Sequence, residues 1–252
     1  KLNQDKPVQY TIPPDAQRKY DLAEAKFKRG DLKEAEEGFK QVAKEYHDTP
    51  IREEALFMEP LACAVRAVRR SPLLPGDRVI VVGLGSMGLI LCQLLLQKGM
   101  VVLATDLEES RVQIAQRLGA LNLRSPEGQK NLPELGGVDM VLLTAGPPLL
   151  IQSALQWVRA GGTIHLFAAL DGEPCSTTFA DFYHREVTLL TTYSSIPRDL
   201  REAFGLLATK AITPRRFGWE GGERGAISDA IERTLGRQTI KAIIYPQKPP
   251  AS

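Results

Sequence analysis

The stretch Arg78-Val79-Ile80-Val81-Val82-Gly83-Leu84-Gly85-Ser86-Met87-Gly88 decides the fold of this chain. An apolar run typical of a buried strand leads into a Gly-x-Gly-x-x-Gly turn, and an apolar segment typical of a helix, Leu89–Leu96, follows. A second apolar run, Met100–Thr105, ends on Asp106, 18 residues after the last glycine of the turn. Strand, glycines, helix and acid at these spacings predict a βαβ unit that binds a dinucleotide.

Each residue of this pattern has a physical reason. Gly83 permits the tight turn, Gly85 lets the main chain approach a diphosphate, and Gly88 allows close packing of helix on strand. Free N–H groups at the helix start favour an anion. Asp106 would accept hydrogen bonds from the adenosine ribose, which favours NAD over NADP, and Arg111 would flank the ribose or adenine. The alternative is a glycine-rich turn of another α/β protein, with Asp106 as a strand cap.

The rest of the chain from residue 58 onward alternates between strand and helix patterns. This rhythm predicts an α/β fold, a Rossmann-type doubly wound parallel sheet, over residues 58–252. Strands are expected at 138–144, 163–168 and 187–191, and helices at 110–118, 151–159 and 197–209. Gly161-Gly162 is interpreted as the stop of the helix at 151–159.

Residues 1–57 have a different character, which predicts an α-helical hairpin before the sheet. Apolar residues recur at helical spacing on both sides of Gly30-Asp31, and Asp31 is a natural N-cap. The pattern resembles one tetratricopeptide repeat in the following residues: Ala23, Phe27, Gly30, Leu32, Ala35, Phe39, Tyr46 and Pro50. Because a single repeat cannot bury its apolar faces alone, the hairpin must dock within this chain or on a partner.

Composition narrows the class of protein. Apolar residues make up 43% of the chain, which is enough for a core, and a net charge of +2 without a basic, aromatic-rich stripe disfavours nucleic-acid binding. No run reaches membrane-spanning length, and the polar start lacks the pattern of a signal peptide. The three cysteines, Cys63, Cys92 and Cys175, are widely spaced. A cytoplasmic location is therefore expected.

Several segments together resemble the cofactor domain of medium-chain dehydrogenases, which include zinc-dependent alcohol, sorbitol and threonine dehydrogenases. The resemblance covers about three-quarters of the chain. It rests on Met58–Val68, Pro75-Gly76-Asp77, the glycine turn, Asp106, Arg111–Ala120, Gly137–Val141, Val158–Ile164, Tyr193-Ser194-Ser195 and the strand-like tail Lys241–Pro246.

The resemblance implies an oxidoreductase that transfers hydride between a secondary alcohol and NAD. It places the following residues against the cofactor: Gly83, Gly85, Ser86, Met87, Gly88, Asp106 and Arg111. Thr144 and Phe167, which follow later strands, would lie near the nicotinamide half.

A catalytic zinc, which the family implies, finds few ligands in this sequence. The family carries a zinc-bearing catalytic domain before the segment that starts at Met58, whereas this chain has a short helical stretch with one histidine, His47, and no cysteine. Catalytic zinc takes about three protein ligands. Glu59 alone matches a position beside the metal, and it can equally serve a helix N-terminus that begins at Glu59-Pro60.

The other reactive side chains favour structural roles. His165 alternates within an apolar strand and is interpreted as a hydrogen-bonded sheet histidine, and His184 as surface. Tyr193 lacks the lysine four residues later that a Tyr/Lys hydride site needs. Cys63 and Cys92 lie among apolar helix residues and are expected to be inert. No residue is assigned as catalytic.

Two hypotheses follow. The first is an NAD-binding oxidoreductase domain with weak or absent turnover on its own. The alternative is an interaction protein whose hairpin binds a partner while the sheet domain serves as scaffold. Substrate, partner and oligomeric state, including a homo-oligomer, stay open.

Overall fold

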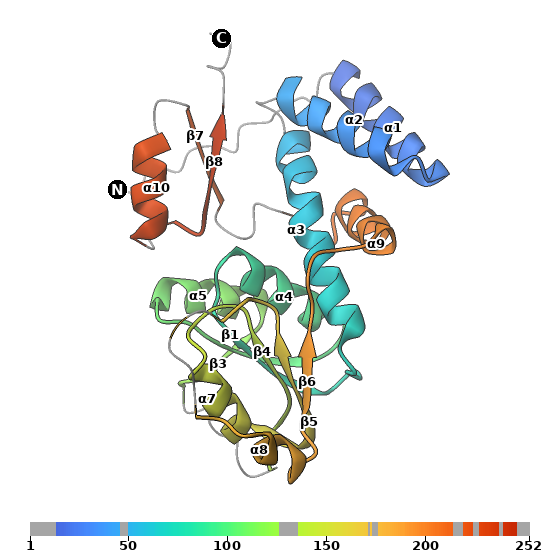
Figure 1. Ribbon diagram of the computed structural model, residues 1–252. Coiled ribbons are helices and arrows are strands. Elements are labelled where there is room, and N and C mark those ends of the chain that lie inside the picture. The colour runs from blue at the N-terminus through green and yellow to red at the C-terminus, as the bar shows by residue number, and fades with distance from the viewer. Residues whose placement is uncertain are drawn as a thin grey trace.

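The computed structural model describes residues 14–45, 50–125, 136–170, 172, 176–213, 219–223, 227–236 and 239–245. It contains a parallel sheet covered by helices, a helical hairpin, and a small two-stranded unit near the carboxyl-terminal end (Figure 1). His47 and Cys175 lie outside the described residues.

The central sheet has six parallel strands in the order β3-β2-β1-β4-β5-β6. The bounds are β1 Arg78–Val82, β2 Val101–Thr105, β3 Leu121–Asn122, β4 Val138–Leu143, β5 Val158–Leu166 and β6 Thr188–Thr191. Strands buried on both faces read as nearly continuous apolar runs, as the Val-Ile-Val-Val of β1 does. The predicted doubly wound parallel sheet is confirmed.

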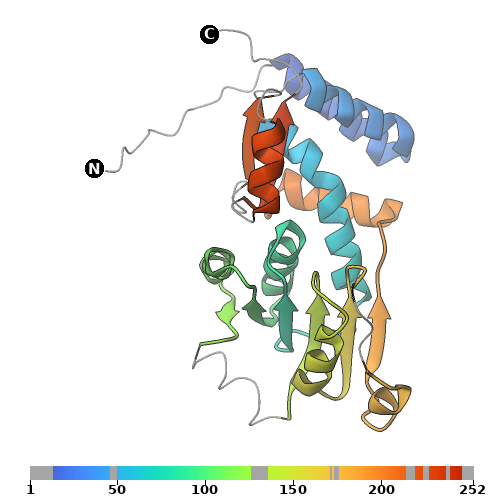
Figure 2. The ribbon, with the colours of Figure 1, turned by 60° about the vertical axis from the view of Figure 1, so that its left-hand side comes forward.

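Helices cover both faces of this sheet. Val79 and Val81 face one apolar layer, with α3 Pro50–Arg70, α4 Ser86–Gln97, α5 Glu109–Leu118 and α9 Pro197–Ala208. Ile80 and Val82 face the opposite layer, which contains α7 Leu150–Trp157. This alternation follows from the period of two in a strand, which sends successive side chains to opposite faces. The carboxyl ends of these six strands all lie at the same edge of the sheet (Figure 2).

The boundary between α7 and β5 differs from the sequence-based expectation. The helix ends at Trp157, and Gly161 and Gly162 lie inside β5, where the register with β4 shifts. The Arg185 guanidinium donates to the carbonyl oxygens of Leu155 and Val158 at the helix end. The Arg185 side chain thus provides hydrogen bonds for the last carbonyl groups of α7. The sequence-based expectation had assigned the end of this helix to Gly161 and Gly162.

Helix α3 is longer than the expectation and continues through the predicted domain boundary at residue 57. Pro60 lies inside this helix, so the prediction that Glu59 and Pro60 open a helix is wrong. Proline has no N–H, so the Leu56 carbonyl loses the hydrogen bond that it would otherwise accept from residue 60. The α3 helix joins the hairpin directly to the sheet.

The predicted hairpin is present as α1 Pro14–Arg29 and α2 Leu32–Glu45, with Gly30 between them at a φ of +93°. Its buried aromatic residues face Phe204 of α9, at ring-centroid distances of 6.1 Å from Tyr20, 5.7 Å from Phe27 and 6.1 Å from Phe39. The hairpin therefore docks within this chain. Its similarity to a tetratricopeptide repeat stays a prediction.

The C-terminal unit consists of β7 Trp219–Glu223, α10 Ile227–Leu235 and β8 Lys241–Tyr245. The strand-like tail expected at residues 241–246 forms β8, which pairs in parallel with β7 in a separate two-stranded sheet. The two views agree that this C-terminal unit lies beyond the carboxyl ends of β1 and β2, on the side of α4 and α5 (Figures 1 and 2). A short helix, α8 Phe179–Tyr183, lies at the opposite end of the sheet.

Candidate functional site

The glycine turn after β1 is held in a conformation that only glycine adopts easily. Gly83 has a φ of +91°, and its N–H donates to the Thr105 carbonyl at 2.9 Å. A Cβ atom added to Gly83 would lie 2.7 Å from the Thr144 hydroxyl oxygen. Backbone conformation and lack of space therefore both require glycine here.

Gly88 allows the closest approach in the turn. A Cβ atom at this residue would lie 1.9 Å from the carbonyl oxygen of Gly83, a distance that no side chain tolerates. The hydroxyl of Thr144, which follows β4, donates a hydrogen bond to the same Gly83 carbonyl oxygen at 2.7 Å. The last glycine of the motif thus packs α4 onto β1, as the sequence predicts.

The start of α4 offers open backbone N–H groups. Its N-cap residue, Gly85, makes no side-chain cap, and the first turn contains no acidic residue. A Cβ atom on Gly85 would meet nothing within 4 Å. Ser86 and Met87 follow as the first residues of the helix. The N-terminus of α4 is therefore shaped and polarised for an anion.

Asp106 lies at the end of β2 with its side chain 8% exposed. Its two carboxylate oxygens accept hydrogen bonds from the Leu84 N–H at 2.6 Å and from the Glu108 N–H at 2.9 Å. Arg111 on α5 places one guanidinium nitrogen 3.8 Å from the same carboxylate, and its Nε is buried with no partner among the described residues. A carboxylate has about four acceptor positions, so Asp106 can still accept ribose hydroxyls.

A cavity of about 720 Å³ lies at the carboxyl ends of β1, β2 and β4, and its lining does not include Gly85, Ser86, Met87 or Gly88. Of the predicted site residues, it is lined by Gly83, Asp106 and Arg111. The rest of its lining comes from Val82, Thr105, Leu107, Leu123, Arg124, Ala145, Gly146, Pro147, Leu150 and Trp157. Its volume suits a drug-sized ligand or the adenosine part of a dinucleotide.

Arg124 is a lining residue that sequence reasoning missed. It follows β3, so the rule that ligands bind at the carboxyl ends of strands applies to it as well. The signal was too weak because β3 spans two residues, Leu121–Asn122, and shows no clear alternation.

Thr144 and Phe167 lie at strand ends, as the resemblance implies. The Thr144 hydroxyl supports the glycine turn. Phe167 is partly buried against the layer of α3 and α4, and its N–H donates to the Leu143 carbonyl at 3.0 Å. Their roles near a nicotinamide remain predictions.

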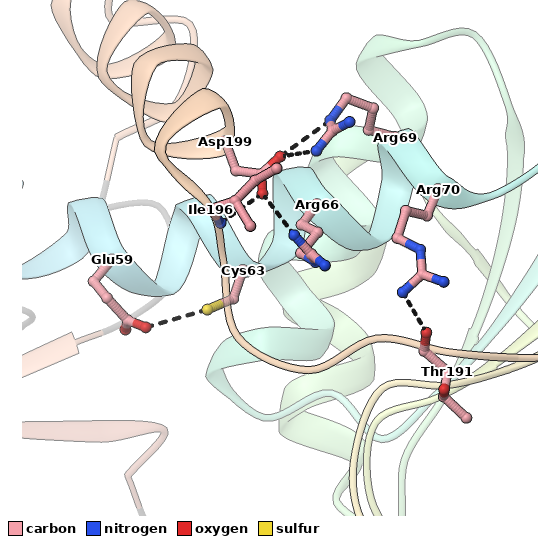
Figure 3. Close-up of polar contacts among 8 residues, drawn as sticks. All are labelled: Glu59, Cys63, Arg66, Arg69, Arg70, Thr191, Ile196 and Asp199. Atoms are coloured by element: carbon pink, nitrogen blue, oxygen red, sulfur yellow. Dashed lines mark hydrogen bonds and ion pairs between the residues drawn. The ribbon is translucent and has the colours of Figure 1, made fainter. Parts of the chain in front are cut away.

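The surroundings of Glu59 do not assemble a zinc site. Its carboxylate accepts a hydrogen bond from the Cys63 thiol at 3.2 Å, one helical turn along α3 (Figure 3). Within the described part of the chain, no three His, Cys, Asp or Glu side chains gather as metal ligands. Burial and the Glu59 hydrogen bond raise the pKa of the Cys63 thiol to about 12, so without a metal this thiol stays protonated.

As expected, Cys92 is a buried thiol, and His165 is a buried histidine that is hydrogen-bonded within the sheet. Burial raises the pKa of the Cys92 thiol to about 12. His165 lies between the hydroxyl oxygens of Ser71 at 3.1 Å and Thr192 at 2.7 Å. Burial, assisted by the positive charge of Arg70, lowers its pKa to about 4, so the ring is neutral.

His184 and Tyr193 are surface residues. His184 is exposed at the end of α8, and Tyr193 is 93% exposed. Neither side chain lines the cavity beside Asp106. The exposure of His184 agrees with its interpretation as a surface residue, whereas the expectation that Tyr193 packs against other residues is wrong.

A cluster of arginines on α3 surrounds one carboxylate of α9 (Figure 3). Asp199 is fully buried and accepts hydrogen bonds from the Arg69 guanidinium and from the Ile196 N–H at 2.9 Å, while Arg66 lies 3.6 Å away. Arg70 donates to the Thr191 carbonyl at 2.9 Å. These contacts fix α9 and the end of β6 against α3, away from the lining of the cavity.

None of the helices in the described ranges has the length and apolar character needed to cross a membrane.

Comparison with known proteins agrees with this architecture. Residues 86–209 match the family model described as zinc-binding dehydrogenase. The chain is similar to a sorbitol dehydrogenase of Bacillus subtilis, with 28% identity over 209 residues, 78% of this chain and 58% of that protein. It is also similar to an L-galactonate-5-dehydrogenase of Escherichia coli, with 27% identity over 201 residues, 75% of this chain and 58% of the relative.

Solved structures show the same arrangement of strands and helices. A protein described as a zinc-binding dehydrogenase of Sinorhizobium meliloti 1021, bound to NADP, has 25% identity and a TM-score of 0.67 over 77% of this chain and 59% of its own. An alcohol dehydrogenase of Thermus sp. ATN1 shares the fold with a TM-score of 0.70 at 22% identity, over 78% of this chain and 59% of its own. The chain thus spans somewhat over half the length of these relatives.

Proposed function

We propose that this chain, whose residues 86–209 match the zinc-binding dehydrogenase family model, binds NAD in the cavity beside Asp106 as medium-chain dehydrogenases do. In this proposal the sheet domain supplies the cofactor half of an oxidoreductase that acts on a secondary alcohol. The observation that carries the proposal is the convergence of Gly83, the first glycine of the turn, with Asp106 and Arg111 on one cavity at the carboxyl ends of the strands.

The residues of the site divide the dinucleotide between them. The N–H groups at the start of α4 hold the diphosphate, because they carry the positive end of the helix dipole and no side chain caps them. Asp106 accepts hydrogen bonds from the hydroxyls of the adenosine ribose. The Arg111 guanidinium lies 3.8 Å from the Asp106 carboxylate. Bound NAD supplies the hydride-accepting chemistry, and the protein positions it.

Asp106 also favours NAD over NADP. A 2′-phosphate on the ribose would face a carboxylate whose side chain is 8% exposed, so the repulsion is poorly screened. The neighbouring Arg111 and Arg124 lessen this repulsion, which limits the expected preference to about tenfold, or 1.4 kcal/mol.

The described residues do not fit a catalytic zinc. Glu59 and Cys63 are two neighbouring candidates on one helix, whereas catalytic zinc takes about three protein ligands. No step of alcohol oxidation is therefore derived from these residues, and weak or absent turnover is proposed for this chain by itself. Zinc-dependent alcohol oxidation by the purified chain would overturn that part of the proposal.

Calorimetric titration tests cofactor binding. The wild-type chain should bind NAD, and NADP about tenfold more weakly. Asp106→Ala should weaken NAD binding by about tenfold or more, because hydrogen bonds to a charged group are lost, and should narrow the NAD preference. Glu109→Ala, an exposed residue of α5, is the matched control and should change neither affinity. Equal affinity of the wild type and Asp106→Ala for NAD would contradict the ribose assignment.

The alternative, a partner-binding hairpin, has no supporting observation. The aromatic residues of the hairpin are buried against Phe204 of α9.

A further inference from the structure

The cavity beside Asp106 extends along one face of α7. Leu150, the first residue of this helix, and Trp157, the last, both line it. Residues seven positions apart lie on the same face of an α-helix, about 10 Å from one another along its axis. The cavity therefore follows α7 for about two helical turns.

The direction of α7 shows which way the cavity runs. This helix follows β4 and ends directly before β5, which pairs with β4 in parallel, so α7 runs antiparallel to both strands. Leu150 thus lies near the carboxyl edge of the sheet, and Trp157 lies towards the amino ends of the strands. The cavity continues from Asp106, at the end of β2, along the side of the sheet to Trp157.

The two ends of this cavity differ in chemistry. Its charged lining residues, Asp106, Arg111 and Arg124, follow the carboxyl ends of β2 and β3. The lining on the α7 side is apolar, since Leu123 is buried and Trp157 packs partly buried against the same apolar layer. Polar groups of a ligand are therefore favoured at the Asp106 end, and an apolar or aromatic group is favoured at the α7 end.

An adenosine bound as proposed directs one edge of its base along this cavity. When the ribose hydroxyls bind Asp106, the purine atoms farthest from the ribose are N1, C6 and the exocyclic N6. A group attached to N6 would extend away from Asp106, whereas a group attached to C8 would stay beside the ribose. Substituents at these two positions of the base therefore sample different ends of the cavity.

We propose that Leu123, Leu150 and Trp157 form an apolar subsite beyond the adenine, and that this subsite binds an aromatic or apolar group attached to N6 of the base. The ligands that fit it are purine nucleosides and nucleotides with such a group. They compete with NAD, because they use the same positions for the ribose and the base. This inference rests on the proposed binding of NAD beside Asp106, and it adds a subsite that determines ligand specificity.

Calorimetric titration of the wild-type chain with three nucleosides tests the subsite. N6-benzyladenosine carries an apolar aromatic group at the far edge of the base, adenosine with a benzylamino group on C8 carries it beside the ribose, and adenosine carries none. N6-benzyladenosine should bind about tenfold more tightly than adenosine, because it buries a phenyl ring, and it should displace NAD. The C8-substituted nucleoside should bind no more tightly than adenosine.

Variants of Trp157 assign the gain in affinity to the subsite. Trp157→Ala removes the aromatic wall and should lose the tenfold gain of N6-benzyladenosine while it still binds adenosine. Trp157→Phe keeps an aromatic ring and should retain most of the gain. Phe179→Ala is the matched control, because Phe179 is an exposed aromatic residue outside the cavity, and it should retain the whole gain.

Tryptophan fluorescence tests the same contact without a change at the subsite. The chain has two tryptophans, Trp157 and Trp219, so Trp219→Phe leaves Trp157 as the only indole. N6-benzyladenosine should change the emission of this variant saturably, over the concentrations at which it binds in the calorimeter. Adenosine should change the emission less, because its base does not extend to the Trp157 ring.

Several outcomes would overturn the subsite. They are equal affinity of the wild type for N6-benzyladenosine and adenosine, an equal gain for the C8-substituted nucleoside, a full gain in Trp157→Ala, or unchanged emission of Trp157 on binding. Failure of the wild type to bind both NAD and adenosine would instead refute the proposed function. A chain that binds NAD and adenosine without any gain from the N6 group would refute the subsite alone, so the two failures are distinguishable.

Discussion

Gly85 and Gly88 lie three residues apart, yet a methyl group added to each would meet different surroundings. At Gly85 the space is open, whereas at Gly88 the methyl carbon would lie 1.9 Å from the Gly83 carbonyl oxygen. We expect Gly88→Ala to cost about 3 kcal/mol or more of unfolding free energy through overpacking. Chemical denaturation followed by circular dichroism measures this loss.

Gly85→Ala is the matched variant with the opposite expectation. It should change stability by less than about 1 kcal/mol, the usual range for a change at an N-cap. It should weaken NAD binding by about tenfold, because the added carbon stands where the diphosphate approaches the backbone. A stable Gly88→Ala protein, or a Gly85→Ala protein with full NAD affinity, would contradict these roles.

His165 predicts a pH dependence of stability. Ser71 donates its one hydroxyl proton to the Ala67 carbonyl at 2.9 Å, so His165 Nδ1 donates to Ser71 and Nε2 accepts from Thr192. The folded pKa is about 4, below the value of about 6.5 in an unfolded chain. Between these values the unfolded state binds a proton that the folded state does not, so stability falls as pH falls from about 6.5 to 4.

The expected loss over this pH range is about 3 kcal/mol. Urea unfolding of His165→Gln at several pH values should lack this component of the slope. His184→Gln, a change at an exposed histidine, should keep it. Parallel pH profiles for the wild type and His165→Gln would show that the buried ring is not the responsible group.

At the scale of elements, α3 and α9 are joined through Asp199. This carboxylate is fully buried and is held by Arg69, Arg66 and the Ile196 N–H at the start of α9 (Figure 3). Asp199→Ala would leave two arginines facing a site without an anion. Breaking such a buried pair costs about 3–5 kcal/mol, which thermal or chemical unfolding would detect.

Glu202 on the same helix provides the control for Asp199. Its carboxylate lies 3.7 Å from the Lys98 ammonium, and the side chains of Lys98 and Glu202 are 46% and 35% exposed. Such surface pairs contribute about 0–1 kcal/mol, so Glu202→Ala should have little effect. A similar loss for both variants would mean that α9 helicity, and not the buried ion pair, sets the stability of this junction.

Elements with strong local signals were predictable from the sequence. The buried run of β1, the glycines and Asp106 each express a requirement that one residue type satisfies, so the βαβ unit followed directly. The end of α7 was not predictable, because the carbonyl groups there accept hydrogen bonds from Arg185, which lies in a distant segment of the sequence. Pro60 misled for a related reason, since tertiary packing keeps α3 helical through a residue that usually starts a helix.

The candidate site likewise contains residues that the sequence predicted and a residue that it missed. Gly83, Asp106 and Arg111 were found because a known motif spacing relates them. Arg124 follows a short, weakly patterned strand, and only the folding of the chain brings it near the other three residues.

At the scale of the whole molecule, the ring of Phe204 on α9 packs against the aromatic face of the hairpin. Phe204 is 6% exposed and contacts the rings of Tyr20, Phe27 and Phe39. Phe204→Ala should cost about 3–5 kcal/mol in the docking of α1 and α2. Limited proteolysis should then cleave the hairpin first, while NAD titration of the intact variant stays near the wild type.

Phe179→Ala is the control for this variant, because Phe179 is 93% exposed on α8. It should leave the proteolysis pattern unchanged. If Phe204→Ala abolished NAD binding together with hairpin docking, the hairpin would be part of the cofactor site and not a separately docked element.

A crystal structure of the chain grown with millimolar NAD tests the central claim most directly. The account predicts the diphosphate at the N–H groups that begin α4, with the adenosine ribose hydroxyls on Asp106 and the adenine in the cavity beside Arg111. A dinucleotide bound elsewhere, or a ribose that leaves the Asp106 carboxylate without contact, would contradict it.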